Sequence, residues 1–254
     1  MPEKPQHEPT KTSAVIYLSS NRPLRVPDFF AEFHENWPSS SLEKTGREPH
    51  RAFFRAGRSD FSLEYHHSPV PQAITEPVVD STLHWPTASA AIGRHVAYLE
   101  VQGTPPSNGT MTLACDLTRA IASFLVVTDA IAVCWLSGPA LNQSKTFITT
   151  AREMFGTGLY PLPLWTAVRW DENAHTLATH GMAQFGAPEV ILGHQPDAAP
   201  LMVEYLFQTA LSLLISRHPI REGETLDSPH GPIRVKTSKI EGKGREVLIL
   251  DPAS

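Results

Sequence analysis

Residues 111–136 read MTLACDLTRAIASFLVVTDAIAVCWL, and this stretch decides the class of fold. Its first part, Met111–Val127, is strongly apolar and long, which predicts a helix in a hydrophobic core. Its second part, Ala130–Leu136, is a short continuous apolar run, which is typical of a buried strand. A buried helix that leads directly into a buried strand predicts a layered protein in which helices pack on a sheet.

The residues before this stretch predict the order β, α, β, β, α, β. We expect a loop at Ser39–Pro49 and, because it is rich in proline and turn residues, an extended surface segment at Ser68–Pro86. The order is the split-βαβ, ferredoxin-like pattern. The expected strands are Ser13–Ser19, Arg51–Arg55, Asp60–His66 and His95–Gln102, and the expected helices are Asp28–Trp37 and Thr87–Arg94.

The residues after the stretch repeat this alternation of helices and strands without a detectable sequence repeat. Helices are expected at Asn142–Phe155 and Ala199–Arg217, and strands at Leu164–Trp170, Thr176–His180, Glu189–Gly193, Ile233–Lys236 and Arg245–Leu250. We therefore expect an α+β protein with two ferredoxin-like (split βαβ) lobes whose helices pack on mainly antiparallel sheet. The lobes are expected at residues 12–103 and 104–254, in one compact unit, after a disordered tail at residues 1–11.

Charge and composition argue against several classes of function. The chain of 254 residues has a formal net charge of -5, so it lacks the basic footprint of a protein that binds nucleic acid or anionic lipid. Its start is polar and has no apolar signal region, and its longest apolar runs are too short to span a bilayer. We therefore expect a soluble cytoplasmic protein. Cys115 and Cys134 lie in apolar segments and are expected to be buried free thiols.

The stretch Thr179–Leu192, THGMAQFGAPEVIL, is the most informative one for function. In a catalytic interpretation, His180 is a general base or metal ligand and Glu189 is an acid or a second ligand. In a structural interpretation, Gly181 and Gly186 supply turn conformations and the histidine hydrogen-bonds the loop. The sequence favours the structural interpretation, because no neighbouring motif completes a site.

Other reactive residue types are poorly arranged for catalysis along the chain. His66 and His67 are adjacent, so on a strand they point to opposite faces and cannot jointly hold one metal without distortion. The patterns HExxH, CxxC and GxSxG do not occur. We therefore expect neither a metal nor a cofactor.

Tryptophans give one further indication of a surface groove. Trp85 lies between a histidine and a proline at the head of an expected helix. The positions of Trp165 and Trp170 differ by an odd number, so a regular strand would place them on opposite faces. Core packing is the default expectation for both, and one of them is a candidate for lining a groove.

Several segments carry a likeness to a known family, among them EGETLDS near Gly223 and Thr225 and the three that follow. Residues 68–102 hold a tryptophan-proline pair that leads into a helix and the strand HVAYLEV, and residues 117–138 hold a helix followed by DAIAVCW. The third has the pattern Thr-x-Gly-Met…Phe-Gly-x-x-Glu, at Thr179, Gly181, Met182, Phe185, Gly186 and Glu189. In these segments the chain resembles the bacterial family called domain of unknown function 4261, although His180 stands where the family often has arginine. The resemblance supports the fold and implies no catalytic residue, because the family has no established activity.

Three hypotheses for function follow. The first is a non-catalytic module that binds a protein or small molecule in a groove formed by Thr179, His180, Gly181, Gly186 and Glu189, together with Trp85. The second is a hydrolase in which His180 and Glu189 converge as acid/base groups. The third is an immunity-like interaction protein that acts through an edge strand or an acidic surface. The sequence leaves a homodimer open and predicts neither nucleic acid nor a membrane as partner.

Overall fold

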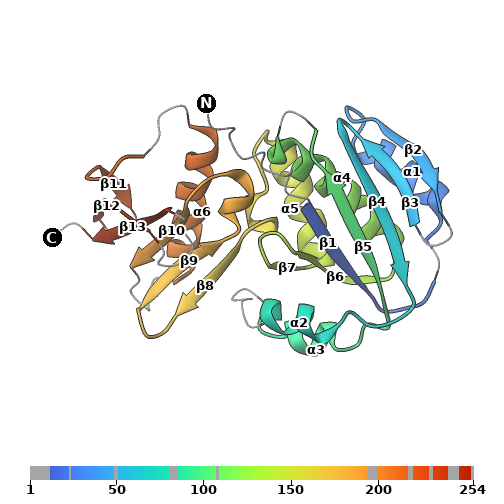
Figure 1. Cartoon of the computed structure of the whole chain (residues 1–254), viewed down its shortest axis with the longest axis horizontal. Helices are drawn as coiled ribbons and strands as arrows, with labels where there is room; N and C mark the ends of the chain where they lie inside the picture. Colours follow the sequence, from blue (N-terminus) through green and yellow to red (C-terminus); the bar gives the residue numbers. More distant parts are fainter. Residues whose placement is uncertain are drawn as a thin grey trace, which may run out of the picture.

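The computed structural model describes residues 12–22, 24–48, 51–79, 85–106, 109–193, 199–216, 220–228, 231–239 and 246–252. The tail expected at residues 1–11 lies outside these ranges. Two sheets, each with its own helices, lie next to each other along the longest axis of the molecule (Figure 1).

The first sheet has seven strands in the order β2-β3-β4-β5-β1-β6-β7, and every neighbouring pair is antiparallel. The interior strand β1, between β5 and β6, is buried on both faces, as its continuous apolar sequence predicts. The strands are β1 (Thr12–Leu18), β2 (Leu42–Arg47), β3 (Arg51–Ala56), β4 (Ser59–His66), β5 (Ala97–Thr104), β6 (Ala130–Trp135) and β7 (Ala140–Gln143).

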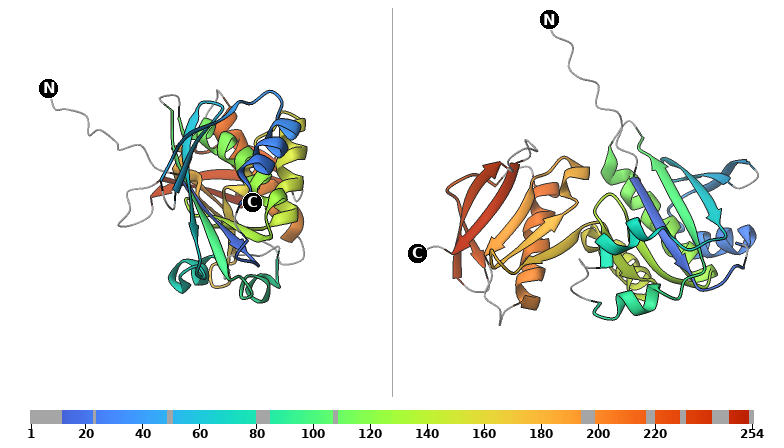
Figure 2. Two further views of the ribbon diagram at one scale, coloured as in Figure 1. Left: turned by 90° about the vertical axis from the view of Figure 1, so that its right-hand side faces the viewer. Right: turned by 60° about the horizontal axis from the view of Figure 1, so that its bottom comes forward.

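Helices cover the two faces of this sheet unequally. On one face lie α1 (Val26–Asn36), α4 (Thr110–Val127) and α5 (Ser144–Gly156), packed over Ala14 and Ile16 of β1. On the other face lie α2 (Gln72–Val79) and α3 (Ala88–Ile92), packed over Val15 and Tyr17 of the same strand. These two short helices cover the part near β1, β6 and β7, and among the described residues no helix covers the part over β2–β5 (Figure 2).

The second sheet has six strands in the order β11-β12-β13-β10-β9-β8. Only the β10–β13 pair is parallel. The helix α6 (Ala199–Ile215) packs on this sheet, and its buried residues join the core of the first sheet. The remaining elements are η1 (Leu162–Leu164), β8 (Ala167–Asp171), β9 (Thr176–His180), η2 (Met182–Phe185), β10 (Glu189–Gly193), β11 (Thr225–Ser228), β12 (Gly231–Lys239) and β13 (Glu246–Pro252).

The expected α+β class with mainly antiparallel sheets is confirmed, whereas the ferredoxin-like lobes are not. In a ferredoxin-like lobe the first strand would lie beside the second strand of the hairpin, but here β5 lies between β4 and β1. The segment expected to be extended, residues 68–86, contains α2. Because β4 and β5 are antiparallel neighbours, that segment is a long hairpin connection and not a crossover.

The division into lobes also differs from the expected one. Both β6 and β7 belong to the first sheet, although they fall in the lobe expected at residues 104–254. The chain changes sheets between β7 and β8, near residues 144–166. The loop expected at Ser39–Pro49 contains the edge strand β2, whose polar sequence conceals it because only Leu42 is buried.

The helix α4 is, among the described residues, the one helix long and apolar enough to cross a membrane. Buried residues make up 67% of it, because α4 packs against the first sheet and against α1 and α5. That burial is typical of the core helix of a soluble protein.

Candidate functional site

The loop predicted to carry function is held in place by the carboxylate of Glu189. One oxygen accepts hydrogen bonds from the backbone N–H groups of Gly181 and Ala183, at 2.9 and 3.4 Å. The other accepts the hydroxyl of Thr179 at 2.8 Å, and this buried hydroxyl in turn accepts the backbone N–H of Val190 at 2.8 Å. The carboxylate therefore binds the first turn of η2, where N–H groups lack helical partners.

Gln184 of η2 connects this loop to the first sheet. Its amide oxygen accepts the indole N–H of Trp135 at 2.9 Å. Its amide nitrogen donates to the carbonyl oxygens of Trp165 and Gly181, at 3.0 and 2.8 Å. The indole of Trp165 donates to Thr118 of α4 at 2.7 Å. All of these side chains are buried, and each of their polar groups has a hydrogen-bond partner. The network therefore joins the two sheets without leaving a buried polar group of its own unpaired.

We use the name junction for the contact that Trp135, Gly138 and Trp165 make with the loop Thr179–Glu189. Two glycines let the backbones come close together there. A Cβ on Gly138 would lie 1.8 Å from the carbonyl oxygen of Trp165. A Cβ on Gly181 would lie 2.5 Å from the Cα of Gly138, and the φ of Gly181 is 125°. No other residue fits either position without moving the backbone. The glycine that the sequence singled out at 181 therefore serves the docking of the sheets.

The other residues predicted for the site are spread over the molecule. His180 ends β9 opposite Ala167 and is half-buried, and strand alternation points it away from the side on which Thr179 lies. Gly186 has a φ of 74° and ends η2 in the left-handed conformation. Trp85 packs on the cluster beneath α2 and α3, a different cluster from the one that contains the loop.

An apolar pocket of about 320 Å³ lies beside the end of the loop. Its lining includes Phe185, Gly186, Ala187, Leu213, Ile220 and Val247. The pocket combines the end of the loop, where Gly186 is the one predicted site residue in the lining, with the end of α6 and with β13. The polar side chains at Thr179, His180 and Glu189 are not part of its lining.

The cysteines are poorly suited to nucleophilic chemistry. Burial raises the pKa of the Cys134 thiol to about 12, and burial, opposed by the nearby Arg119, raises that of Cys115 to about 12. Both thiols are therefore protonated at neutral pH. Across the described part of the chain, no three histidine, cysteine, aspartate or glutamate side chains form a group that could hold a metal ion.

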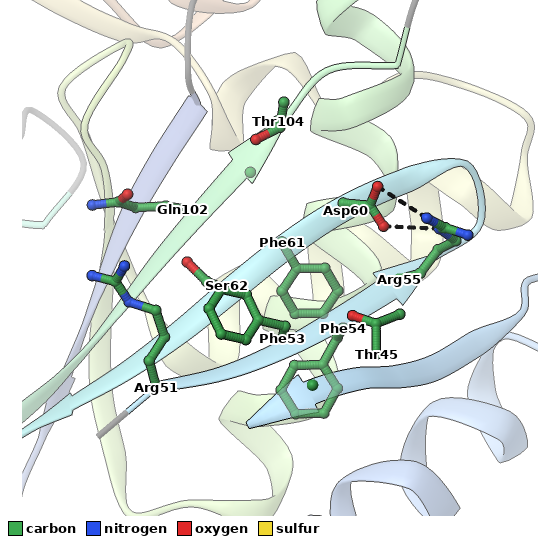
Figure 3. Close-up of a pocket in the computed structure, with 12 residues that line it drawn as sticks. Thr45, Arg51, Phe53, Phe54, Arg55, Asp60, Phe61, Ser62, Gln102 and Thr104 are labelled. Carbon is green, nitrogen blue, oxygen red and sulfur yellow. Dashed lines mark hydrogen bonds and ion pairs between the residues drawn. The ribbon is translucent and has the colours of Figure 1, made fainter. Parts of the chain in front are cut away.

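A larger groove, of about 510 Å³, lies on the open face of the first sheet over β2–β5 (Figure 3). We call it the open-face groove. Its middle row consists of four residues that pair directly across four strands: Gly46, Phe53, Ser62 and Gln102. Because paired residues of neighbouring strands point to the same face, the phenyl ring, the hydroxyl and the amide stand together. Figure 3 shows the Phe53 ring between the two ends of the groove.

Ion pairs close both ends of the open-face groove. At one end Arg55 donates to both oxygens of Asp60, at 2.8 and 3.1 Å, and Thr104 pairs across from Asp60. At the other end Arg51 binds Glu64, with its Nε 3.0 Å from Oε2. The two residues of each ion pair lie directly opposite each other on β3 and β4. Each pair is two residues along these strands from Phe53 and Ser62, so it points to the same face as the middle row.

Beyond Glu64, the polar surface continues towards the helices that cover the rest of this face. Glu100 lies opposite Glu64 and accepts the amide of Gln102 at 2.6 Å. His66 stacks on Tyr98 with 4.2 Å between ring centroids, and its Nε2 lies 3.7 Å from Glu100. The two polar groups that line the inner end of the groove, Arg51 and Gln102, are therefore both oriented by glutamates.

The open-face groove was not predicted from the sequence, although two of its strands carry a pattern that points to an exposed face. Along β4 and β5 the polar residues alternate with apolar ones, but alternation alone does not show which strands are neighbours. The grouping of Phe53, Ser62 and Gln102 depends on β5 pairing with β4, which the ferredoxin-like expectation did not include.

Comparisons with family models, with curated proteins and with solved structures give no match for this chain. The resemblance to the domain of unknown function 4261 family therefore stays a prediction.

Proposed function

We propose that this protein is a non-catalytic cytoplasmic module that binds its ligand in the open-face groove. The observation that carries the proposal is the middle row, in which Phe53, Ser62 and Gln102 stand together on the uncovered part of a sheet. Small-molecule sites combine an apolar or aromatic surface with a few placed polar groups, in cavities of about 300–1,000 Å³. The open-face groove has this composition and, at about 510 Å³, this size.

At the junction the polar side chains bind the chain itself, whereas the groove has polar groups that could bind a ligand. The hydroxyl of Ser62 makes no hydrogen bond with the described residues, and the amide oxygen of Gln102 makes none either. Arg51 and Arg55, at the two ends, are each engaged by a carboxylate. The hydroxyl and the amide oxygen therefore keep their hydrogen-bonding capacity for a ligand, whereas the two guanidinium groups are already paired.

The hydrolase hypothesis, with His180 and Glu189 as acid/base groups, has less support. A general base takes up a proton from the reacting group, so it needs an oxygen that can reach the substrate. Both oxygens of Glu189 accept hydrogen bonds from the chain itself. A Glu189→Gln variant that stays folded but loses turnover of a substrate would favour this hypothesis over ours.

The interaction-protein hypothesis would use an edge strand, and β2 is one edge of the first sheet. Charged residues and a bulge are devices that protect an edge from pairing with another strand. The strand β2 has both: Lys44 and Arg47 are exposed, and the register shifts between Lys44 and Gly46. Strand addition at this edge is therefore less favoured than occupation of the groove.

Protein-observed NMR tests the proposal. Mixtures of sugars, peptides, nucleotides and small acids would be added to the isotope-labelled chain, and we expect shifts at residues of β3, β4 and β5 that line the groove. A Gly46→Leu variant places a side chain beside Phe53, since a Cβ there would lie 3.4 Å from the ring, and should abolish the shifts. Gly156→Leu, where a Cβ meets nothing within 4 Å, is the matched control.

Two results would contradict the proposal. One is a set of shifts confined to the apolar pocket at residues 185–187, with the groove unchanged. The other is a ligand that shifts the groove equally in the wild-type chain and in Gly46→Leu.

A further inference from the structure

We infer that the open-face groove binds a neutral oligosaccharide. This inference rests on the proposed function, and it adds the chemical class of the ligand. Four properties of the groove support it: its charge, its aromatic surface, its hydrogen-bonding groups and the pairing of the strands that form its floor.

The charges of the groove compensate each other. Arg55 binds Asp60 through two nitrogens, and Arg51 binds Glu64 through two nitrogens. Within the described lining, both guanidinium groups are therefore matched by a carboxylate. A phosphate or carboxylate ligand is bound best by guanidinium or ammonium groups that have no other anion. The groove offers none, so its charge fits an uncharged ligand.

The aromatic surface belongs to Phe53. The ring is half-buried in the middle row, and its neighbour on the edge strand is Gly46, which has no side chain to cover it. The face of an aromatic ring is the negative part of its quadrupole, and it attracts weakly positive hydrogen atoms. One face of a pyranose ring presents several C–H groups of this kind, so a sugar can stack on Phe53.

The hydrogen-bonding groups are suited to hydroxyls. Ser62 and Thr104 have hydroxyls that both donate and accept, and Gln102 has an amide oxygen that accepts. The Arg55–Asp60 pair adds N–H donors and carboxylate lone pairs at the end of the groove. A sugar hydroxyl also donates and accepts, so it can pair with each of these groups, whereas an apolar ligand would leave them without partners.

The pairing of the strands argues against a peptide as occupant, and the ion pairs argue against a nucleotide. The strands β3, β4 and β5 are each paired on both sides, so their backbone groups are used, and a peptide laid across them would lack backbone partners. A nucleotide could stack its base on Phe53, but its phosphate would meet the ion pairs described above. An oligosaccharide needs only side-chain partners and a ring to stack on, and the groove supplies both.

Titration calorimetry and saturation-transfer NMR with maltose, cellobiose and diacetylchitobiose test the inference. We expect at least one of these neutral sugars to bind, and Phe53→Ala to weaken it by about tenfold or more, which is about 1.4 kcal/mol. Phe53→Trp should keep binding, because it keeps an aromatic face. Phe185→Ala, which changes the half-buried aromatic residue of the other pocket, should leave the sugar affinity unchanged.

Gly46→Leu covers the case in which Phe53→Ala fails to fold, because it removes no side chain. Loss of sugar binding in this variant, with Gly156→Leu unaffected, supports the inference. The inference is overturned if no neutral sugar binds, or if glucose 6-phosphate binds more tightly than glucose. Should a peptide or a nucleotide instead shift the groove residues, the proposed function stands and only the sugar class fails. If no class of compound shifts them, both fail.

Discussion

The junction and the open-face groove both combine polar side chains with aromatic ones, and they use them in opposite ways. At the junction the amide of Gln184 makes three hydrogen bonds to the chain, and the carboxylate of Glu189 accepts three more. In the groove the hydroxyl of Ser62 makes none with the described residues, and the ring of Phe53 is half-buried.

This difference indicates that a dense sequence motif can serve the folding of the backbone and not the binding of a ligand. Two glycines, a proline and a glutamate within residues 179–189 mark a backbone that must take an unusual path, and the chain then satisfies its own polar groups there. A binding surface needs no such density, because neighbouring strands bring its residues together from distant parts of the sequence. Stability should therefore respond to changes at the junction, and ligand binding to changes in the groove.

The largest effect is expected at Gly138. Gly138→Ala places a Cβ 1.8 Å from the carbonyl oxygen of Trp165, so the two backbones must separate and the network around Gln184 is disrupted. We expect the free energy of unfolding to fall by at least about 3 kcal/mol in a urea titration followed by circular dichroism. The control, Gly156→Ala at the exposed end of α5, should be neutral or stabilising by up to about 1 kcal/mol. Equal stability of the two variants would show that the sheets are not docked through Gly138.

A smaller loss is expected at Gln184. Gln184→Leu keeps the volume approximately but removes the acceptor of the buried indole N–H of Trp135 and the side-chain donor to the carbonyl oxygens of Trp165 and Gly181, of which the second keeps the backbone N–H of residue 184. The expected loss is about 2–3 kcal/mol, measured by thermal and urea unfolding. Gln208→Leu, at an exposed position of α6, is the matched control and should change stability by less than about 0.5 kcal/mol. A wild-type melting temperature for Gln184→Leu would mean that water replaces the amide.

Thr179 gives a test within one strand. Thr179→Val removes a buried hydroxyl that donates to Glu189 and accepts from Val190, and we expect a loss of about 1–2 kcal/mol. Thr176→Val, at a half-buried position of the same strand, should cost less than about 0.5 kcal/mol. The comparison would turn against the structural role of the loop if both threonines were equally tolerant.

The class of fold was accessible from the sequence because the strongest patterns were long and uniform. The apolar run at 111–127 is α4, and the run at 130–136 contains β6, as expected. The strand order was not accessible, since β1 is apolar on both faces and its sequence does not distinguish β4 from β5 as a neighbour. The edge strand β2 and the helix α2 were missed because neither has the apolar periodicity of its class: β2 buries one residue and α2 contains Pro77.

The structural role of the loop was also accessible in part. Gly181 and Gly186 were expected to supply turn conformations, and both have positive φ. Its partners were not accessible, because Trp135, Gly138 and Trp165 come from other parts of the chain and meet the loop only in the folded protein. The groove could not be predicted for the same reason, because Phe53, Ser62 and Gln102 come from three strands and meet only in the folded sheet.

The smallest effect is expected in the groove, and two serines of β4 sharpen the contrast. Ser59 is fully buried and donates to Asp116 of α4 at 2.8 Å, so Ser59→Ala should lower the free energy of unfolding by about 1–2 kcal/mol. Ser62 lies three residues further on, on the open face, where its hydroxyl has no partner among the described residues. Ser62→Ala should therefore change stability by less than about 0.5 kcal/mol, and weaken only the binding of a groove ligand. A loss of stability at Ser62 as large as at Ser59 would show that the groove serves the fold, because a hydroxyl kept for a ligand contributes nothing to folding.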